Sequence, residues 1–510
     1  LFADDLWGID YELALDLHTT GAEAVAVNRN PDQLVDKIVL HAKCLHDKVP
    51  ALTTMLNFYG WQNRLNETID AATGLLKLLG VKIPRHAGKA HVAWEFTMAK
   101  RAVGKKSDKE LLGLPVARNK DKIAAMRALQ QIASISFFSD ADLMLVVSLR
   151  AFRISLKAGI DREVSPFCFA SYGACLRYTK SYDEAVRFVQ LARRLCDIHE
   201  SKFIRASAYT TIYGLGLHQT SPVEDMYHPL LEGFKSGLAH GNPGHGLSCA
   251  NIAMITKWMT GSPLRKLAEM IDRYIHLMEV YNRTGLVCVT CTFHQRVLNL
   301  LGQSDDPLVL TGTSMDQESH ISSMRESGNH VGLFFAVEHV FQLSCLFEDW
   351  DKAAVYYKKV VACPDGIKSL EIHLYIREYR FYEALFHFVM YQRDGARKHK
   401  RSALQIVKMM RESQANGCPN YDCYLPILLV EMNARKLTKD EMNTAYRKAA
   451  VMAKYVHLRA LAHERAAAVI REQFRDGYLA RQHLEAAKRQ YRKWGAVEKV
   501  SHVEEKLQML

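Results

Sequence analysis

Chain-breaking residues are scarce in this sequence. The 28 glycines and 13 prolines among 510 residues make up roughly 8% of the chain, against about 12% in an average protein. An all-β protein needs a turn about every 8–12 residues, so this scarcity argues against one.

Long hydrophobic runs are absent as well. The most apolar stretch, Leu143–Leu149, is far shorter than the roughly 18 residues of a membrane span, and no transmembrane segment is expected.

Motifs for catalysis and nucleotide binding are also missing. Gly104 and Lys105 resemble the end of a phosphate-binding loop, but Ala99 stands where that loop requires a glycine. The dinucleotide fingerprint, the zinc-protease helix motif, the serine-hydrolase elbow and the kinase catalytic set do not occur. No isolated pair of acidic residues lies in an apolar setting that would favour acid–base chemistry. The sequence therefore predicts a protein that is not an enzyme and holds no cofactor.

The cysteines form no disulfide framework. There are eleven, an odd number, and most lie in apolar helical stretches, where a free thiol behaves as a small hydrophobic side chain. This usage favours a reducing compartment, so a cytoplasmic protein is expected. The chain begins with Leu1 and carries no signal segment. We expect it to be the ordered part of something longer.

Three metal-ligating residue types meet at one turn. His240, His245 and Cys249 lie around Gly241-Asn242-Pro243-Gly244, and imidazole and thiolate groups beside a flexible turn can hold zinc. With 22 histidines in the chain, chance clusters of this kind are expected. The sequence predicts no bound metal, and these three residues are its candidates if one is present.

The net charge of +12 is modest for this length, but basic residues concentrate at positions 100–122 and 397–401. An anionic partner, nucleic acid or acidic protein, could bind these two segments. Aromatic side chains do not alternate with the charges, as a stacking platform for single strands requires. We therefore interpret both segments as solvated surface and do not expect nucleic acid, and the anionic partner stays as an alternative.

Helical periodicity runs through almost every long segment. Apolar residues recur with the i, i+3, i+4, i+7 spacing of an amphipathic helix, and breaks come every 12–20 residues. Such spacing predicts helices of about 12–18 residues joined by short turns. The predicted fold is all-α, a tetratricopeptide-like solenoid or superhelix of 22–26 helices in about 11–13 α-α hairpins. Each hairpin is expected to pack only on its neighbours, so no single large core is needed.

Small residues recur at the offsets of a 34-residue helix–turn–helix repeat. Two helices of a hairpin approach closely only where a side chain is a methyl group or absent, and aromatic residues fill the remaining groove. We predict structural packing roles for these positions and for the last aromatic–glycine pair of the chain. The residues are Phe169, Gly173, Ala185 and Ala192 in one copy, Ala468, Ala480 and Ala487 in a second, Trp350 and Ala353 in a looser third, and Trp494 and Gly495 at the end.

The domain organisation is expected to be bipartite. Residues 1–301 form an N-terminal helical-repeat array, and residues 331–510 form a C-terminal array that ends in a capping helix. Residues 302–330 carry turn formers and weak periodicity, so they are predicted to be a long connection. Long connections often lie on one face of a solenoid, so this segment is a candidate binding loop.

The order of the helical segments resembles a known family. Leu79–Pro84, Lys109–Pro115 and the terminal Tyr491-x-x-Trp494-Gly495 are similar to the helical-repeat region of large multidomain signalling ATPases. Those proteins combine a protein-kinase-like domain, a STAND-type ATPase, tetratricopeptide-like helices and often a GAF and histidine-kinase end. The resemblance implies that any ATPase or kinase activity lies outside this chain. It also implies that the helices sense or recruit partners and restrain the ATPase switch.

These observations lead to one functional expectation and two alternatives. The expected function is a non-catalytic interaction and regulatory scaffold for signal transduction. A protein partner or neighbouring domain would lie on the concave face of the superhelix. The alternatives are the anionic-partner binder described above and a small-molecule sensor that buries its ligand between hairpins. The sequence does not specify the oligomeric state.

Overall fold

The computed structural model describes residues 6–27, 29–199 and 202–510, and these form 27 α-helices. The first fourteen are α1 (Leu6–Ile9), α2 (Tyr11–Ala26), α3 (Asp32–His41), α4 (Leu45–Trp61), α5 (Leu65–Leu78), α6 (Lys89–Val103), α7 (Asp108–Leu112), α8 (Lys120–Ser139), α9 (Ala141–Ala158), α10 (Ser165–Leu176), α11 (Tyr182–His199), α12 (Lys202–Thr211), α13 (Tyr227–Ala239) and α14 (Pro243–Met259). The remaining thirteen are α15 (Leu264–Val280), α16 (Thr284–Leu300), α17 (Gln317–Glu326), α18 (His330–Leu346), α19 (Trp350–Val361), α20 (Pro364–Leu370), α21 (Ile376–Asp394), α22 (Arg397–Ala415), α23 (Leu425–Asn433), α24 (Lys439–Met452), α25 (Val456–Phe474), α26 (Gly477–Trp494) and α27 (Val497–Gln508).

The predicted all-α array of hairpins is confirmed. Consecutive helices pack against each other along the described part of the chain, as in α10–α11, α13–α14 and α25–α26. The helices slightly outnumber the predicted 22–26 because α1, α7 and α20 have only four, five and seven residues, too few to show a period. None of the helices within the described ranges combines the length and apolar character that crossing a bilayer requires.

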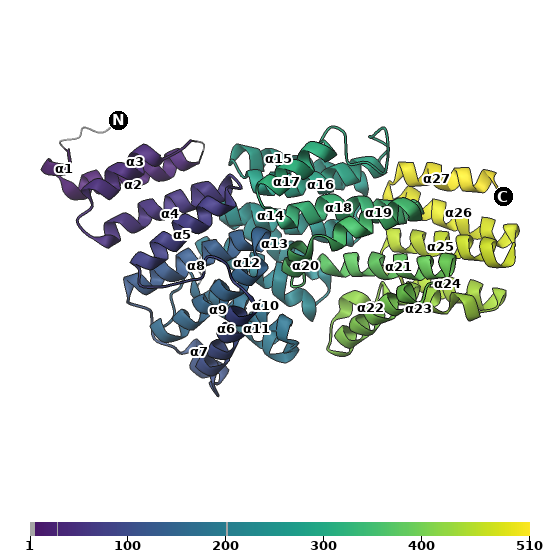
Figure 1. The fold of residues 1–510 in the computed structure, drawn as a ribbon, viewed down its shortest axis with the longest axis horizontal. Coiled ribbons are helices and arrows are strands. Elements are labelled where there is room, and N and C mark those ends of the chain that lie inside the picture. The colour runs from purple at the N-terminus through teal and green to yellow at the C-terminus, as the bar shows by residue number, and fades with distance from the viewer. Residues whose placement is uncertain (1–5, 28, 200–201) are drawn as a thin grey trace.

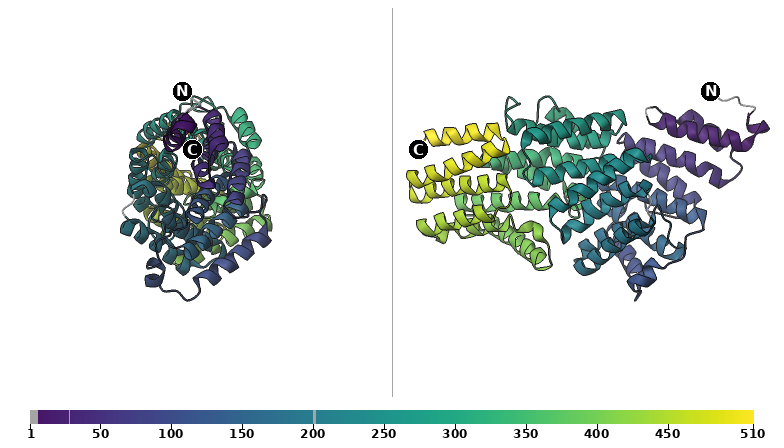
Figure 2. Two further views of the ribbon diagram at one scale, coloured as in Figure 1. Left: turned by 90° about the vertical axis from the view of Figure 1, so that its left-hand side faces the viewer. Right: turned by 180° about the vertical axis from the view of Figure 1, so that it is seen from behind.

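The helices form an elongated molecule whose two ends are built from the two ends of the chain. Helices α1–α5 lie at one end of the long axis and α24–α27 at the other (Figure 1). The view from behind shows α24–α27 stacked in layers and the middle helices between the two ends (Figure 2). A small hydrophobic cluster joins α1–α4, and a second one extends from Leu56 in α4 to Leu507 in α27.

The α10–α11 hairpin shows why small residues define the repeat. A β-carbon placed on Gly173 would lie 2.8 Å from the Ala185 carbonyl oxygen and 3.0 Å from the Val189 backbone nitrogen, closer than real β-carbons approach. Phe169, Ala185 and Ala192 are buried around this crossing. The two backbones can come this close only because Gly173 has no side chain.

Replacing Gly173 with alanine should therefore destabilise the protein, although alanine is the better helix former. We expect Gly173→Ala to lower the free energy of unfolding by about 1–3 kcal/mol through overpacking. Gly74 in α5 is the matched control, because a β-carbon there meets nothing within 4 Å. Gly74→Ala should stabilise by roughly 0.5–1 kcal/mol. Urea unfolding of both variants measures the difference, and equal effects would show that the crossing can relax.

Most of the other predicted packing residues are buried as well. Trp350, Ala353, Ala480, Ala487 and Trp494 are all buried, and Gly495 ends α26 in the left-handed conformation with φ of 88°. Ala468 differs, because it is only half-buried, whereas its neighbours Ala466 and Ala467 are 0% and 3% exposed. The repeat offsets therefore place Ala468 one residue away from the buried stripe of α25.

The expectation that each hairpin packs only on its neighbours is wrong for the middle of the chain. Helix α20 contacts α8 and α9, helix α18 contacts α8, and α16 contacts α4. Lys368 in α20 donates to Asp142 in α9 at 2.5 Å, and Arg177 donates from Nε to the carbonyl of Glu371 at 3.0 Å. The array thus folds back on itself. Its larger hydrophobic cluster also crosses the predicted boundaries at residues 301 and 331 without a break.

The predicted connection at residues 302–330 is packed against α16 and contains α17. Asn299 in α16 donates from Nδ2 to the carbonyl of Val309 at 2.8 Å. Leu310 is 0% exposed and belongs to the hydrophobic core. Because its backbone is fixed by α16 and its apolar side chain is buried, the segment is a structural cover and not a free loop.

Candidate functional site

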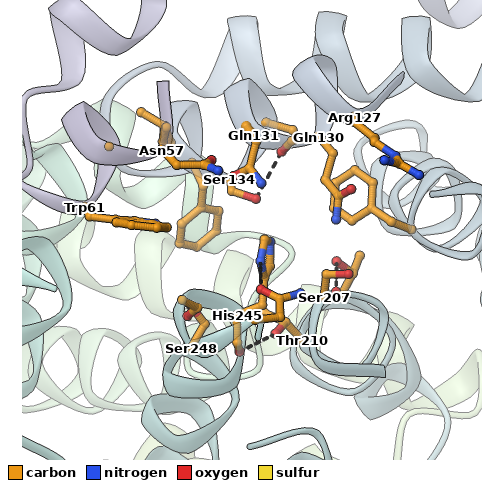
Figure 3. A pocket seen from close by; sticks show the side chains of 18 of the residues that line it. Asn57, Trp61, Arg127, Gln130, Gln131, Ser134, Ser207, Thr210, His245 and Ser248 are labelled. Atoms are coloured by element: carbon orange, nitrogen blue, oxygen red, sulfur yellow. Dashed lines mark hydrogen bonds between the residues drawn. The ribbon is translucent and has the colours of Figure 1, made fainter. Parts of the chain in front are cut away.

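A large cavity lies between hairpins of the N-terminal half and has a volume of about 1260 Å³. Figure 3 shows its two walls: side chains of α4 and α8 face side chains of α12 and α14 across the open space. Helices α10, α16, α18 and α20 also contribute to its lining. The fold-back of α16, α18 and α20 onto the first hairpins therefore turns a concave face into a pocket.

Uncharged polar side chains project from both walls of a lining that is mostly apolar. Amides project from Asn57 and Gln131, and hydroxyls from Ser134, Ser207 and Ser248 (Figure 3). The deeper lining includes apolar side chains of α10, α16 and α18, among them Phe167, Val289 and Phe335. An apolar pocket with a limited set of hydrogen-bonding groups is the usual composition of a ligand site.

Two glycine positions bring α14 into place as one wall. A β-carbon on Gly237 would lie 2.6 Å from the α-carbon of Gly246, so α13 and α14 cross at nearly the closest possible distance. On the same wall, α12 continues as a π-helical turn at Ile212–Gly216. The carbonyl of Gly214 in that turn accepts from the amide of Leu374 at 3.2 Å. Such turns release backbone groups from the helical ladder, and here one of them ties α12 to the chain after α20.

Two residues of the pocket lining carry buried hydrogen-bond acceptors that have no partner. The imidazole Nδ1 of His245 lies 3.1 Å from Oδ1 of Asn242. Because that amide oxygen accepts, the neutral ring keeps its free lone pair on Nε2. Burial, with a contribution from nearby Arg283, lowers the pKa of His245 to about 4, so the ring is neutral at pH 7. Both His245 Nε2 and Asn57 Oδ1 are buried without a hydrogen-bond partner.

Arg283 is a buried cation at the edge of the same pocket. It occupies the turn between α15 and α16, is 2% exposed, and lines the pocket. Its guanidinium carbon lies 3.4 Å from the ring centroid of Trp61. Nε and both Nη atoms are buried without a hydrogen bond. Burial lowers the pKa of Arg283 to about 9, which still leaves it positively charged at pH 7.

The three metal candidates do not form a metal site. His240 is exposed and bonds the carbonyl of Ser236 through Nδ1 at 2.9 Å, and Cys249 donates to the carbonyl of Ala206 at 3.2 Å. Burial raises the pKa of Cys249 to about 12, so its thiol stays protonated. Throughout residues 6–27, 29–199 and 202–510, no group of three or more His, Cys, Asp and Glu residues is arranged to hold a metal. Only His245 of the candidates has a free ring nitrogen in the large pocket.

A second pocket, of about 860 Å³, is strongly basic. Arg150 and Arg153 of α9 form its inner part and share the carboxylate of Glu95, which is 1% exposed. Six basic and no acidic residues line this groove, and none of its lining residues is aromatic. The six are Lys82, Arg118, Lys122, Arg150, Arg153 and Lys157.

The two basic segments found in the sequence lie on different parts of the molecule. Residues 100–122 surround α7, and residues 397–401 begin α22 (Figure 1). Of all basic residues in these two segments, the second pocket uses only Arg118 and Lys122. The segments therefore do not combine into one surface, and the basic groove draws its other four residues from elsewhere.

Comparison with known proteins gives little beyond the fold. No family model matches the sequence, and no curated protein does. Among solved structures, the chain is similar to a "circular tandem repeat protein with novel repeat topology and enhanced subunit contact surfaces". The identity is 12% and the TM-score 0.15, over 98% of this chain and 96% of that chain, which is too low to support an argument about shape.

The fold class is assigned from the helices themselves. Twenty-seven helices in the described ranges pack in sequence as hairpins. The chain is a tandem helical-repeat protein. Its proposed kinship with signalling ATPases is not shown by any of these comparisons and stays a prediction, as does the compartment.

Sequence reasoning missed the residues that make the pocket distinctive. Asn57, Trp61 and Arg283 belong to no motif, and they come together from α4 and from the turn before α16, more than 200 positions apart in the chain. A lone arginine in a turn carries no local signal that it will be buried without an anion. Only the fold-back of the array reveals it.

Proposed function

We propose that this protein is a non-catalytic interaction scaffold whose large pocket binds an extended segment of a partner polypeptide. The observation that carries the proposal is the pair of facing walls, from which amide and hydroxyl side chains project into one continuous space. Peptide main chains present alternating donors and acceptors, and such side chains match both. The free acceptors on Asn57 and His245 suit the N–H groups of a peptide.

The size of the pocket also supports a peptide over a small metabolite. Ordinary small-molecule sites have volumes of about 300–1,000 Å³, and this pocket exceeds them at about 1260 Å³. The resemblance of the chain to the helical-repeat region of signalling ATPases adds a context. In that context the bound segment would belong to a partner or a neighbouring domain, and its binding would regulate an attached switch.

Filling the pocket should abolish peptide binding. Ser134 projects between the walls (Figure 3), and its Oγ donates only to the carbonyl of Gln130 at 3.1 Å. Ser134→Trp should therefore reduce recovery of peptides at least tenfold. The measurement is affinity selection from a synthetic random decapeptide library with free carboxyl ends, followed by mass spectrometry of the bound fraction.

Thr97 in α6 provides the matched control. Its hydroxyl makes the same bond to the carbonyl four residues earlier, Ala93, at 2.9 Å, but the side chain is exposed and lies outside the pocket. Thr97→Trp should bind peptides as the wild type does. Equal recovery by the Ser134 variant, or no recovery by the wild type, would contradict the proposal.

A second candidate function is binding of a densely charged phosphate compound in the basic groove. Six basic residues line this groove, and only the buried Glu95 offsets them from below. Because no aromatic residue lines it, stacking of nucleic-acid bases gains no support. Phosphate groups need only the converging cations.

Inorganic tripolyphosphate provides a direct test of this groove. We expect Arg118→Gln combined with Lys122→Gln to weaken binding about tenfold and to reduce its dependence on salt concentration. Lys398→Gln with Arg401→Gln, which removes two positive charges from the other basic segment, is the control and should change nothing. Calorimetric titration at 50 and 200 mM salt measures both effects. If the control double variant also loses tripolyphosphate binding, the loss reflects the net charge of the whole molecule and not the basic groove.

A further inference from the structure

The turn between α15 and α16 places a permanent cation in the pocket with no anion beside it. We propose that Arg283 binds a carboxylate of the peptide that enters this pocket. The inference rests on the proposed peptide-binding function and assigns one subsite within the same space. The ligand class is thereby narrowed to peptides that bring a carboxylate to the Trp61 end of the pocket.

Burial without a partner is the first observation behind this inference. All three guanidinium nitrogens of Arg283 lack a hydrogen bond, and no carboxylate among the described residues forms an ion pair with it. No carboxylate among the described residues affects the pKa of Arg283, and the neighbour that raises it is the phenol of Tyr281. A buried charge is costly unless it is paired, so an anion from outside the chain is the simplest missing component.

The described residues include three other buried arginines, and of these only Arg465 has a carboxylate partner: it is 2% exposed and bonds Glu431 at 2.9 Å and Glu348 at 3.0 Å. Arg296 bonds Gln342 and Tyr375 through Nη1 alone, and it does not line this pocket. Arg377 also lacks hydrogen bonds, but it does not line this pocket. Arg283 combines complete burial, absence of a partner and a place in the lining of a large cavity.

The surroundings of Arg283 fit a carboxylate. Stacking on Trp61 at 3.4 Å fixes the plane of the guanidinium group, which can then donate two parallel bonds to both oxygens of a carboxylate. A β-carbon on Gly244 would make ordinary van der Waals contact with Nε1 of Trp61 at 3.4 Å and with the guanidinium carbon at 3.8 Å, so the backbone of α14 lies close to the stacked pair. A single cation balances a carboxylate, whereas a phosphate dianion would keep one negative charge unpaired.

The remaining free groups of the pocket require donors from the same ligand. Asn57 Oδ1 and His245 Nε2 are acceptors, and a peptide supplies N–H groups for them together with a carboxylate for Arg283. That carboxylate comes either from the carboxyl terminus or from an aspartate or glutamate side chain. Both sources offer the same chemistry, and the experiment separates them.

The experiment uses peptides recovered from the library selection, each resynthesised with a free and with an amidated carboxyl end. We expect Arg283→Met to weaken binding of the carboxylate-bearing form about tenfold or more and to leave its neutral counterpart unchanged. If amidation of the peptide removes the difference in affinity between the wild type and Arg283→Met, the terminal carboxylate is the bound group. If it does not, replacing acidic side chains by amides should remove it. Arg273→Met, at an exposed site on α15, is the control and should bind as the wild type does.

A readout without peptide distinguishes ligand binding from a structural role. Removing a buried cation that has no partner should leave the melting temperature of the free Arg283→Met protein unchanged or higher. Benzoate should raise the melting temperature of the wild type and not of the variant, and the neutral isostere benzamide should raise neither. A large fall in melting temperature with undiminished benzoate binding would overturn the inference and make Arg283 a structural residue.

The two proposals fail in different ways. If peptides bind the wild type and Arg283→Met equally, in free and amidated forms, the pocket binds peptides but the carboxylate subsite is wrong. If benzoate binds through Arg283 and no peptide is recovered, the anion subsite stands and the peptide function is wrong.

Discussion

Lowering the pH from 7 to 5 should unfold this protein, with the maximum of its stability near neutral pH. The cause is a set of buried histidines that the fold keeps neutral. Burial lowers the pKa of His373 and of His457 to about 3, and that of His245 to about 4. The other buried or half-buried histidines whose pKa burial lowers are His218, His294, His339, His387, His399, His463, His483 and His502.

The sign of the effect follows from which state binds the proton. In the unfolded chain these histidines take up a proton as the pH falls through their ordinary pKa of about 6.5. In the folded protein burial holds the pKa of each below that value, at about 3–4 for His245, His373 and His457. The stability that they contribute is present above pH 6.5 and is lost as the pH falls below it. Each such histidine contributes about 1.4 kcal/mol per pH unit in this window.

The summed pH dependence of these histidines is large compared with the free energy of unfolding of an ordinary domain. Even five such groups change the free energy of unfolding by about 7 kcal/mol per pH unit, against a typical total of about 5–15 kcal/mol. Glu338 acts in the opposite sense, because burial raises its pKa to about 8. Its contribution is present below pH 4.5 and is lost as the pH rises through 8. Burial also raises the pKa of Glu378, Asp140 and Glu23. Each such carboxyl group offsets at most about one histidine, and the histidines are more numerous, so acidification still unfolds the protein.

Denaturant unfolding followed by circular dichroism at pH 8, 7, 6 and 5 measures this dependence. His373→Gln combined with His457→Gln should flatten the slope below pH 6.5 by about 2.8 kcal/mol per pH unit. His86→Gln, at an exposed histidine, is the control and should leave the slope unchanged. A constant free energy of unfolding between pH 7 and 5 would show that these rings are not held neutral.

Removing the carboxylate of Glu464 should cost about 3–5 kcal/mol of stability, the largest effect that we expect from a single substitution. Glu464 in α25 is 1% exposed and accepts from Lys499 at 2.8 Å and from Lys506 at 2.7 Å. The hydroxyl of Tyr491 donates to its other oxygen at 2.8 Å. These bonds connect α25, α26 and α27, the last three helices of the chain.

The electrostatics of this cluster explain the size of the effect. Burial alone would raise the pKa of Glu464, but the nearby Lys499 and Lys506 hold it well below its usual value. Burial lowers the pKa of Lys499 to about 8 even with Glu464 present. Without the carboxylate, the ammonium group of Lys499 would be buried with no anion beside it. Leaving one charge of a buried pair uncompensated is strongly destabilising.

A double substitution separates the value of the pair from the penalty of breaking it. Glu464→Leu alone should lose about 3–5 kcal/mol, whereas Glu464→Leu with Lys499→Met should recover much of that loss, because apolar replacements of both partners are often neutral. The control is Glu504→Ala, which breaks the exposed Arg492–Glu504 pair and should cost less than about 1 kcal/mol. Equal losses in the single and double variants would show that the cavity, and not the charge, dominates.

The sequence alone determined the all-α class, the hairpin pattern and most of the packing positions. These features are local. A helix is recognised in the sequence by the period of its apolar residues, and a hairpin is recognised by a turn and a pair of small residues. Gly173 and Ala185 were identifiable for this reason. Ala468 was displaced by one residue because several alanines in succession at 466–468 leave the offset ambiguous.

The fold-back of the array and both pockets were decided by the tertiary structure. Contacts of α20 with α8 and α9 depend on the curvature that the intervening hairpins accumulate, and no single segment of sequence encodes that sum. The basic groove combines Lys82, Arg118 and Lys157 from three separate stretches, so charge counting along the chain found only part of it. Arg283 became a candidate binding residue only when the fold buried it beside Trp61 without an anion, because burial and pairing are properties of the whole packed array.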